Sequence, residues 1–193
     1  MVAIPMLAST LLLASLGLAA PVIDARQSTA CFVVGTTTLP AEVATAVTAI
    51  QNNVTCDAKT TTIGKVPDVT SGGIKFSDIN FATSSQTPLA FATSKFATAT
   101  PLASSNLTLF QNQLNVYVAT EAGLRSTASS LAIKAPKFFL SYQIARIKTA
   151  QNIAITDPGQ TVQHLLGKVT KNAGSAETAA TLAAITALST QLS

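Results

Sequence analysis

The stretch PKFFLSYQIARIK, Pro136–Lys148, carries the densest mixture of aromatic, aliphatic and basic side chains in the chain, and its pattern decides the predicted fold. On a helical wheel at about 100° per residue, Phe138 and Tyr142 share one face, while Leu140 and Ile144 lie nearly opposite. A membrane-surface helix needs one apolar and one basic face. Two apolar faces separated by narrow polar seams instead indicate burial between neighbouring helices. We therefore predict that this segment is the central helix of the core.

Further helices are predicted on both sides of this segment, because apolar residues recur there at three- and four-residue spacing. The predicted helical segments are residues 39–53, 87–99, 104–126, 157–174 and 175–192. Thr87 is expected to cap the short second segment, with Pro88 in its first turn. Ser175 is expected to cap the last one, with Glu177 in its first turn.

A small β element is predicted near the N-terminus. Cys31–Gly35 is a short β-prone run, and residues 60–82 combine β-branched residues with turn signals such as Gly72-Gly73. We expect two or three short strands in the second segment, with a bulge or turn near Ser77-Asp78. The predicted fold class is α+β and mainly helical, with a helical bundle-like core and a small N-terminal β element stapled by one disulfide.

The N-terminus has the pattern of an export signal. An apolar run from Met6 to Ala20 ends in small residues, and it is shorter than the roughly 20 residues that a membrane span needs. We predict a signal peptide over residues 1–19. We also hypothesise a second cleavage after Arg26, which would remove a propeptide of residues 20–26 and leave a single secreted domain at residues 27–193. This placement predicts an extracellular or cell-wall protein with no transmembrane segment after processing.

Two cysteines in an exported chain favour a disulfide, here between Cys31 and Cys56. Their spacing fits neither a C-x-x-C motif nor a zinc knuckle, so a redox or metal role is the less favoured alternative. The sequons at Asn53 and Asn106 are expected to accept N-glycans if the source is eukaryotic.

Basic residues are concentrated in the C-terminal half of a chain that has few charges overall. Charged residues make up 10% of the sequence, against about 25% in soluble domains, and the formal net charge is +4. Between positions 125 and 171, one acid, Asp157, is outnumbered by seven basic residues. These are Arg125, Lys134, Lys137, Arg146, Lys148, Lys168 and Lys171. They form a candidate anion-binding face for an extracellular polysaccharide, an anionic lipid or a protein. The alternative is a solvated basic face without a binding role. The cations are too dispersed to form a nucleic-acid-binding motif.

Few residues point to catalysis. His164 is the sole histidine, and we interpret it as a surface or partly buried helix residue rather than a metal ligand or the base of a triad with Asp157. The four-residue spacing of Glu121 and Arg125 predicts a helical ion pair. Because no pair of carboxylates stands out, we predict no catalytic, metal-binding or cofactor-binding residues and no cofactor.

A family resemblance is carried by DARQSTACFVVG, by PDVTSGGIKFSDINF with TPLAFATSKFATATPLAS, and by LNVYVATEAGLRS with KAPKFFLSYQIARIKTAQ. These segments resemble an uncharacterised family of small secreted proteins of filamentous fungi. The resemblance covers nearly all of the mature chain and implies a fungal, extracellular origin, with no established activity and no site residues to transfer. The composition is also similar to that of fungal hydrophobic-surface-binding wall proteins, although the β-prone segment departs from their all-helical plan.

We therefore expect a secreted, non-enzymatic interaction protein of the extracellular space or cell wall, acting at a host or wall surface. One alternative is a carrier of apolar small molecules, which would need a cavity lined by the faces of the 136–148 helix. The other is a hydrolase without a recognisable motif, which would need polar groups converging around His164 or Glu121.

Overall fold

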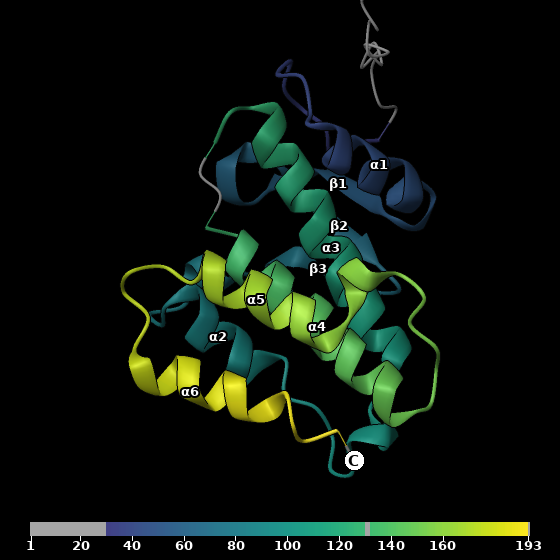
Figure 1. The fold of residues 1–193 in the computed structure, drawn as a ribbon. Helices are drawn as coiled ribbons and strands as arrows, with labels where there is room; N and C mark the ends of the chain where they lie inside the picture. The colour runs from purple at the N-terminus through teal and green to yellow at the C-terminus, as the bar shows by residue number, and fades with distance from the viewer. Residues whose placement is uncertain (1–29, 130–131, 193) are drawn as a thin grey trace, which may run out of the picture.

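The structure, a computed structural model, describes residues 30–129 and 132–192. The predicted signal peptide and propeptide lie outside these residues. Within them the chain forms six α-helices and one three-stranded sheet (Figure 1). In chain order the elements are α1 (Ala41–Ile50), β1 (Thr55–Thr61), β2 (Pro67–Ser71), β3 (Ile74–Lys75), α2 (Pro88–Lys95), α3 (Leu107–Ser126), α4 (Lys134–Ala150), α5 (Val162–Asn172) and α6 (Ala179–Leu188). The predicted α+β, mainly helical class is confirmed.

The central position belongs to α4, as its sequence predicts. This helix packs against α2, α3 and α5, and Figure 1 shows α5 lying across it. Tyr142 of one apolar face and Leu140 and Ile147 of the other are fully buried, so both apolar faces are covered by neighbours. The helix begins at Lys134, two residues before the predicted start at Pro136. Pro136 is tolerated there because the N–H groups of a first helical turn have no partner within the helix.

The small sheet packs beside α3. Its strands pair antiparallel in the order β1-β2-β3, and Cys56 of β1 lies opposite Val69 of β2. Val69 is fully buried, and β2 contacts α3. The sheet therefore joins the core through its middle strand.

A bulge interrupts β1. The register with β2 shifts between Asp57 and Thr61. The Asp57 carboxylate stabilises the bulge, since Oδ1 accepts the Lys59 N–H at 2.9 Å and Oδ2 accepts the Thr60 hydroxyl at 2.9 Å. These hydrogen bonds favour the charged carboxylate and lower the pKa of Asp57.

The strand predicted at Cys31–Gly35 is wrong, because this segment is a loop that lies against the C-terminal end of α3. The Gly35 N–H donates to Ser126 Oγ at 2.9 Å, and Phe32 is fully buried. A side-chain carbon at Gly123 would lie 2.6 Å from the Phe32 carbonyl oxygen, so the close approach requires glycine. The segment's backbone thus bonds to a helix end rather than to a neighbouring strand.

The second β segment is partly as predicted. β1 begins at Thr55, ahead of the predicted segment, and no strand follows Lys75 within residues 76–83. The chain there forms two 3₁₀ helices, Phe76–Ile79 and Phe81–Thr83. The predicted turn near Ser77-Asp78 therefore exists as a 3₁₀ turn. Asp68 holds it by accepting the Ser77 N–H at 3.0 Å and the Ser77 hydroxyl at 2.6 Å.

Tyr117 of α3 joins these turns to the helical core. Its ring centroid lies 5.4 Å from that of Phe76 and 5.7 Å from that of Phe96, both in edge-on geometry. Its hydroxyl donates to the Ile79 carbonyl at 2.6 Å. Burial raises the pKa of the Tyr117 phenol. A buried aromatic cluster thus links α3, α2 and the segment after the sheet.

The last helix begins later than predicted, with Thr178 as its cap in place of Ser175. Glu177 does not join its first turn. The carboxylate instead accepts the Leu89 N–H at 2.9 Å and the Thr87 hydroxyl at 2.7 Å. It therefore lies at the positive N-terminal end of α2, where a carboxylate is stabilised. The predicted Thr87 cap of α2 is confirmed.

Candidate functional site

Arg146 of α4 lies inside the molecule, with 2% of its surface exposed. Its Nε donates to the Leu188 carbonyl at 2.8 Å, and its Nη2 donates to the Gln191 carbonyl at 2.9 Å. Its Nη1 donates to Gln143 Oε1 at 2.5 Å. Burial lowers the pKa of the guanidinium, and Tyr142 partly opposes this effect. Arg146 therefore ties α4 to the C-terminal end of α6 through neutral oxygens.

Two neighbours complete what we call the α4 seam, formed by Tyr142, Gln143 and Arg146. The Tyr142 hydroxyl donates to the Ile185 carbonyl of α6 at 3.0 Å. Gln143 Nε2 donates to the Phe96 carbonyl at the end of α2 at 2.9 Å. Burial raises the pKa of Tyr142 to about 12, with Arg146 acting in the opposite direction. The seam thus fastens α2 and α6 to the central helix.

A second polar group, the Glu121 cluster, joins α3 to the start of α4. The Glu121 carboxylate is 2% exposed, and its Oε1 accepts from Arg125 Nε at 3.0 Å, as the sequence spacing predicts. Its Oε2 lies 2.5 Å from Lys137 Nζ of α4. Lys137 Nζ is also 4.3 Å from the centroid of the Phe138 ring. With one acid and two cations, the cluster keeps a single excess positive charge.

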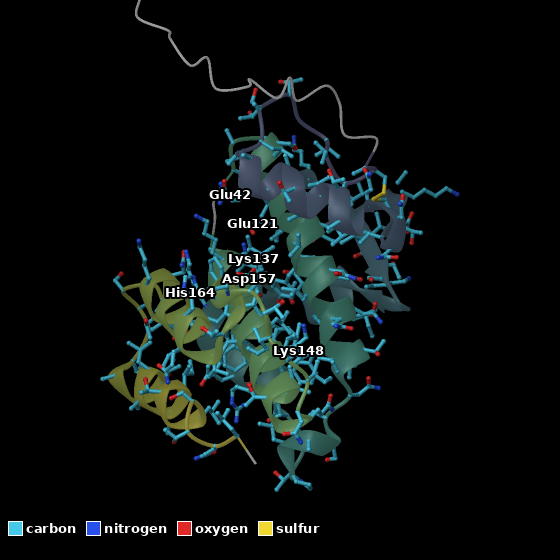
Figure 2. All side chains as sticks on the ribbon, turned by 45° about the vertical axis from the view of Figure 1, so that its right-hand side comes forward. Glu42, Glu121, Lys137, Lys148, Asp157 and His164 are labelled. Carbon is cyan, nitrogen blue, oxygen red and sulfur yellow. A yellow bond between two sulfur atoms is a disulfide. The ribbon has the colours of Figure 1, made fainter. Side chains whose placement is uncertain are left out.

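Four cations of the predicted anion-binding face remain outside these two groups. Lys134 and Lys148 of α4 are half-buried, whereas Lys168 and Lys171 of α5 are exposed. In Figure 2 Lys148 lies apart from Lys137, at the opposite end of α4. The seven predicted residues are thus distributed among a buried seam, an ion cluster and the surface.

The two exposed lysines share one helix. Lys168 and Lys171 are three residues apart, which places them on neighbouring turns about 4.5 Å apart along the axis. Val162, Leu165 and Val169 of the same helix are buried. α5 contains no acidic residue. We call Lys168 and Lys171 the α5 lysine pair.

The residues weighed for catalysis do not meet in a reactive arrangement. His164 is exposed, lies on the outer side of α5 in Figure 2, and its ring makes no hydrogen bond or ion pair within the described part of the chain. Asp157 Oδ1 accepts the Gly159 N–H at 2.8 Å in a tight turn. Over residues 30–129 and 132–192, no three His, Cys, Asp or Glu side chains gather as metal ligands would.

The features linked to export lie at the surface. The disulfide joins Cys31 to Cys56, as predicted. Asn53 and Asn106 are both exposed. Asn106 caps α3 by accepting the Leu109 N–H on Oδ1 at 3.0 Å, which leaves Nδ2, the glycan-bearing atom, outside that hydrogen bond. None of the helices in the described ranges combines the length and apolar character needed to cross a bilayer.

Sequence reasoning missed two contacts that shape this region. Lys137 as a partner of Glu121 was hidden because the two residues come from different helices, although a carboxylate in an apolar stripe is a signal of buried pairing. The role of Arg146 was hidden because its partners at Leu188 and Gln191 are main-chain carbonyls. Main-chain acceptors occur at every residue and leave no mark in the sequence.

Comparisons with known proteins assign the chain to a family whose function is unknown. No curated protein matches the chain, and no solved structure matches it. A family model described as a domain of unknown function, DUF7143, matches residues 33–193. This range contains every helix and strand named above. The chain therefore belongs to the DUF7143 family.

Proposed function

We propose that this protein is a secreted, non-enzymatic interaction protein of the extracellular space or cell wall that binds acidic polysaccharide through the α5 lysine pair. The observation that carries the proposal is the exposure of Lys168 and Lys171 on a helix without acids, whose other side is buried. Lys134 and Lys148 on the neighbouring α4 add further positive potential. Clustered cations raise the local concentration of an acidic polymer and steer its approach.

The arrangement favours a polysaccharide over an anionic bilayer. A helix that lies in a membrane interface inserts its apolar side into the acyl boundary. The apolar side of α5 is already used, because Val162, Leu165 and Val169 are buried in the core. A carboxylated polymer requires only solvent-facing cations, which Lys168 and Lys171 supply.

Export, glycosylation and a fungal source are part of the same proposal. They are supported by the signal-like N-terminus, by the Cys31–Cys56 disulfide, and by the exposed sequons at Asn53 and Asn106. Disulfides persist in oxidising compartments such as the extracellular space. Host or wall surfaces rich in acidic polymers are the setting in which the lysine pair would act.

A non-enzymatic role is supported by the state of the acidic side chain closest to the core. Glu121 is buried, and its two carboxylate oxygens are already engaged by Arg125 and Lys137. A general acid or base must reach the substrate directly or through one water. Glu121 therefore suits structural pairing better than proton transfer.

Binding of polygalacturonate to the secreted protein tests the proposal, with neutral dextran as the control polymer. We expect binding that weakens as salt is added, because the attraction is electrostatic. The double variant Lys168→Gln/Lys171→Gln should bind roughly tenfold more weakly, which corresponds to a loss of about 1.4 kcal/mol.

A matched control is Lys59→Gln/Lys95→Gln, which removes two exposed lysines from β1 and α2 and should leave affinity unchanged. Equal losses in both double variants, or binding indifferent to salt, would contradict the proposal. Tighter binding to phosphatidylserine vesicles than to the polymer would reject the choice of polysaccharide.

A further inference from the structure

An apolar hollow of about 500 Å³ lies beyond the C-terminal end of α4. The hollow is shallow and widely open to solvent, and its volume is comparable with that of small-molecule sites, about 300–1,000 Å³. The hollow is formed by the end of α4, the loop that follows, the start of α5 and the C-terminal segment. Its lining residues are Thr149, Asn152, Ile153, Ala154, Ile155, Thr161, Val162, Gln163 and Leu192.

The end of α4 presents Ile153 to this hollow. Asn152 has a left-handed backbone (φ 56°), its N–H donates to the Thr149 carbonyl at 3.1 Å, and the Ile153 N–H donates to the Lys148 carbonyl at 2.8 Å. In such a helix ending, the residue at the Ile153 position often packs on an apolar residue of the last turn. Here the corresponding residues are Lys148 and Ile147, and Ile147 is fully buried in the core. Ile153 remains 41% exposed and lines the hollow.

The C-terminal segment that borders the hollow is fixed by the α4 seam. Leu192 lines the hollow, and Arg146 Nη2 donates to the carbonyl of the preceding residue, Gln191, at 2.9 Å. Burying a guanidinium without a carboxylate is costly unless its donors are satisfied. The C-terminal end of α6 offsets this cost, because its carbonyls carry partial negative charge. The hydrogen bond from Arg146 therefore holds the main chain next to Leu192 against the central helix.

The lining chemistry defines the ligand class. The apolar part of the lining includes Ile153, Ile155 and Leu192, and the lining contains neither a charged side chain nor an aromatic ring. The side-chain amides of Asn152 and Gln163 make no hydrogen bond within the described residues, so they can bond to a ligand. A charged ligand would meet no counter-charge among these nine residues, and a planar aromatic one no ring to stack on.

We propose that this hollow binds the alkyl chain of an uncharged amphiphile, with the chain against Ile153, Ile155 and Leu192. The polar head group lies at the rim, beside the amides of Asn152 and Gln163. Docking of a second copy is disfavoured by size, because nine residues line the hollow whereas stable interfaces use roughly 20–30 residues a side. This site is separate from the proposed polysaccharide function, since the hollow uses the first turn of α5 and the lysine pair lies in its last turns.

The probe is dodecyl maltoside below its micelle concentration, with maltose as the head-group control. Binding is measured by calorimetry and by methyl NMR of the full secreted protein. We expect saturable shifts of the Ile153 and Ile155 methyl signals with dodecyl maltoside and none with maltose. The variant Ile153→Gln should bind roughly tenfold more weakly, because part of the buried chain contact is lost.

Leu109→Gln is the matched control, since Leu109 is also a partly exposed aliphatic residue (37%) and lies on α3, away from the hollow. It should leave the dissociation constant unchanged. Leu192→Ala supplies a second test in the C-terminal segment and should also weaken binding. The Lys168→Gln/Lys171→Gln variant should bind the amphiphile as the parent does, so the two proposals fail separately.

Three results would overturn the inference. The first is equal affinity in the parent, Ile153→Gln and Leu192→Ala proteins. The second is methyl shifts that map to residues outside the hollow. The third is a dimer in sedimentation that Ile153→Gln abolishes, which would identify a second copy as the occupant.

Discussion

Two buried polar groups hold α4, and they are built on opposite principles. The Glu121 cluster pairs a carboxylate with two cations, Arg125 and Lys137, whereas Arg146 in the α4 seam donates to neutral oxygens. The cations of the cluster can still reach water, with 16% of each side chain exposed, but Arg146 is 2% exposed. The comparison teaches that two equally buried charges can be stabilised differently: Arg146 by neutral oxygens, and Glu121 by two cations that still reach water.

The largest effect should follow from breaking the seam. Arg146→Met removes the guanidinium donors of the Leu188 and Gln191 carbonyls and of Gln143 Oε1, and the Leu188 carbonyl keeps only the Gln191 N–H. We expect the free energy of unfolding to fall by about 3 kcal/mol, because hydrogen bonds to a charged group are strong and buried acceptors are costly to leave unpaired. Urea unfolding measures this, with Lys148→Met on the same helix as the control, expected within about 0.5 kcal/mol of the parent.

The cluster should be the weaker of the two groups. Glu121→Gln leaves Arg125 and Lys137 close together without a carboxylate. We expect a loss of about 2 kcal/mol, less than for Arg146→Met, because the two cations can turn toward solvent. A double-mutant cycle with Lys137→Met sharpens the comparison, since the double variant should lose less than the sum of the two single losses. Strict additivity would show that the Glu121–Lys137 contact contributes nothing.

The smallest effect concerns the phenol of the seam, and it depends on pH. Tyr142→Phe removes one hydrogen bond to the Ile185 carbonyl and should cost about 1 kcal/mol at neutral pH. The folded-state pKa of Tyr142 is raised to about 12, against about 10 for an unperturbed tyrosine. The raised value means that Tyr142 contributes stability below pH 10, and this contribution is lost as the pH rises through about 12.

Unfolding curves between pH 9 and about 12 check this expectation. The parent should lose stability faster than Tyr142→Phe, so the two proteins converge as the solution becomes more alkaline. Some dependence on pH should remain in the variant, because burial also raises the pKa of Tyr117. Parallel curves would contradict the assignment of an alkaline transition to Tyr142.

Local patterns predict much of this fold. The two apolar faces of α4 place it at the centre, and the spacing of Glu121 and Arg125 predicts their ion pair. These inferences succeed because residues three and four apart on a helix are neighbours whatever the rest of the chain does. The disulfide between Cys31 and Cys56 can also be predicted from the sequence, since two cysteines allow only one pairing.

The failures involve partners that are distant in sequence or that belong to the main chain. The sequence predicts Glu177 in the first turn of the last helix. Its carboxylate instead caps α2 by accepting the N–H of Leu89, 88 residues earlier in the chain. Cys31–Gly35 has strand propensity, yet it forms a loop whose Gly35 amide bonds to Ser126 at the end of α3. The sequence pattern suggests that Arg146 is a surface cation. It is instead buried, and its Nε donates to the Leu188 carbonyl of α6. In each case tertiary contacts override a local preference of comparable strength.

The bulge in β1 affects the tendency of the protein to self-associate through its sheet edge. β1 is an outer strand of the described sheet, and a flat outer strand can recruit a strand from another molecule. Asp57 prevents a flat edge by pulling the backbone of Lys59 toward its carboxylate, and both residues place charge on that edge. Because hydrogen bonding lowers the pKa of Asp57, the charge persists in mildly acidic surroundings. The bulge and the charges therefore disfavour pairing of β1 with a strand of another molecule.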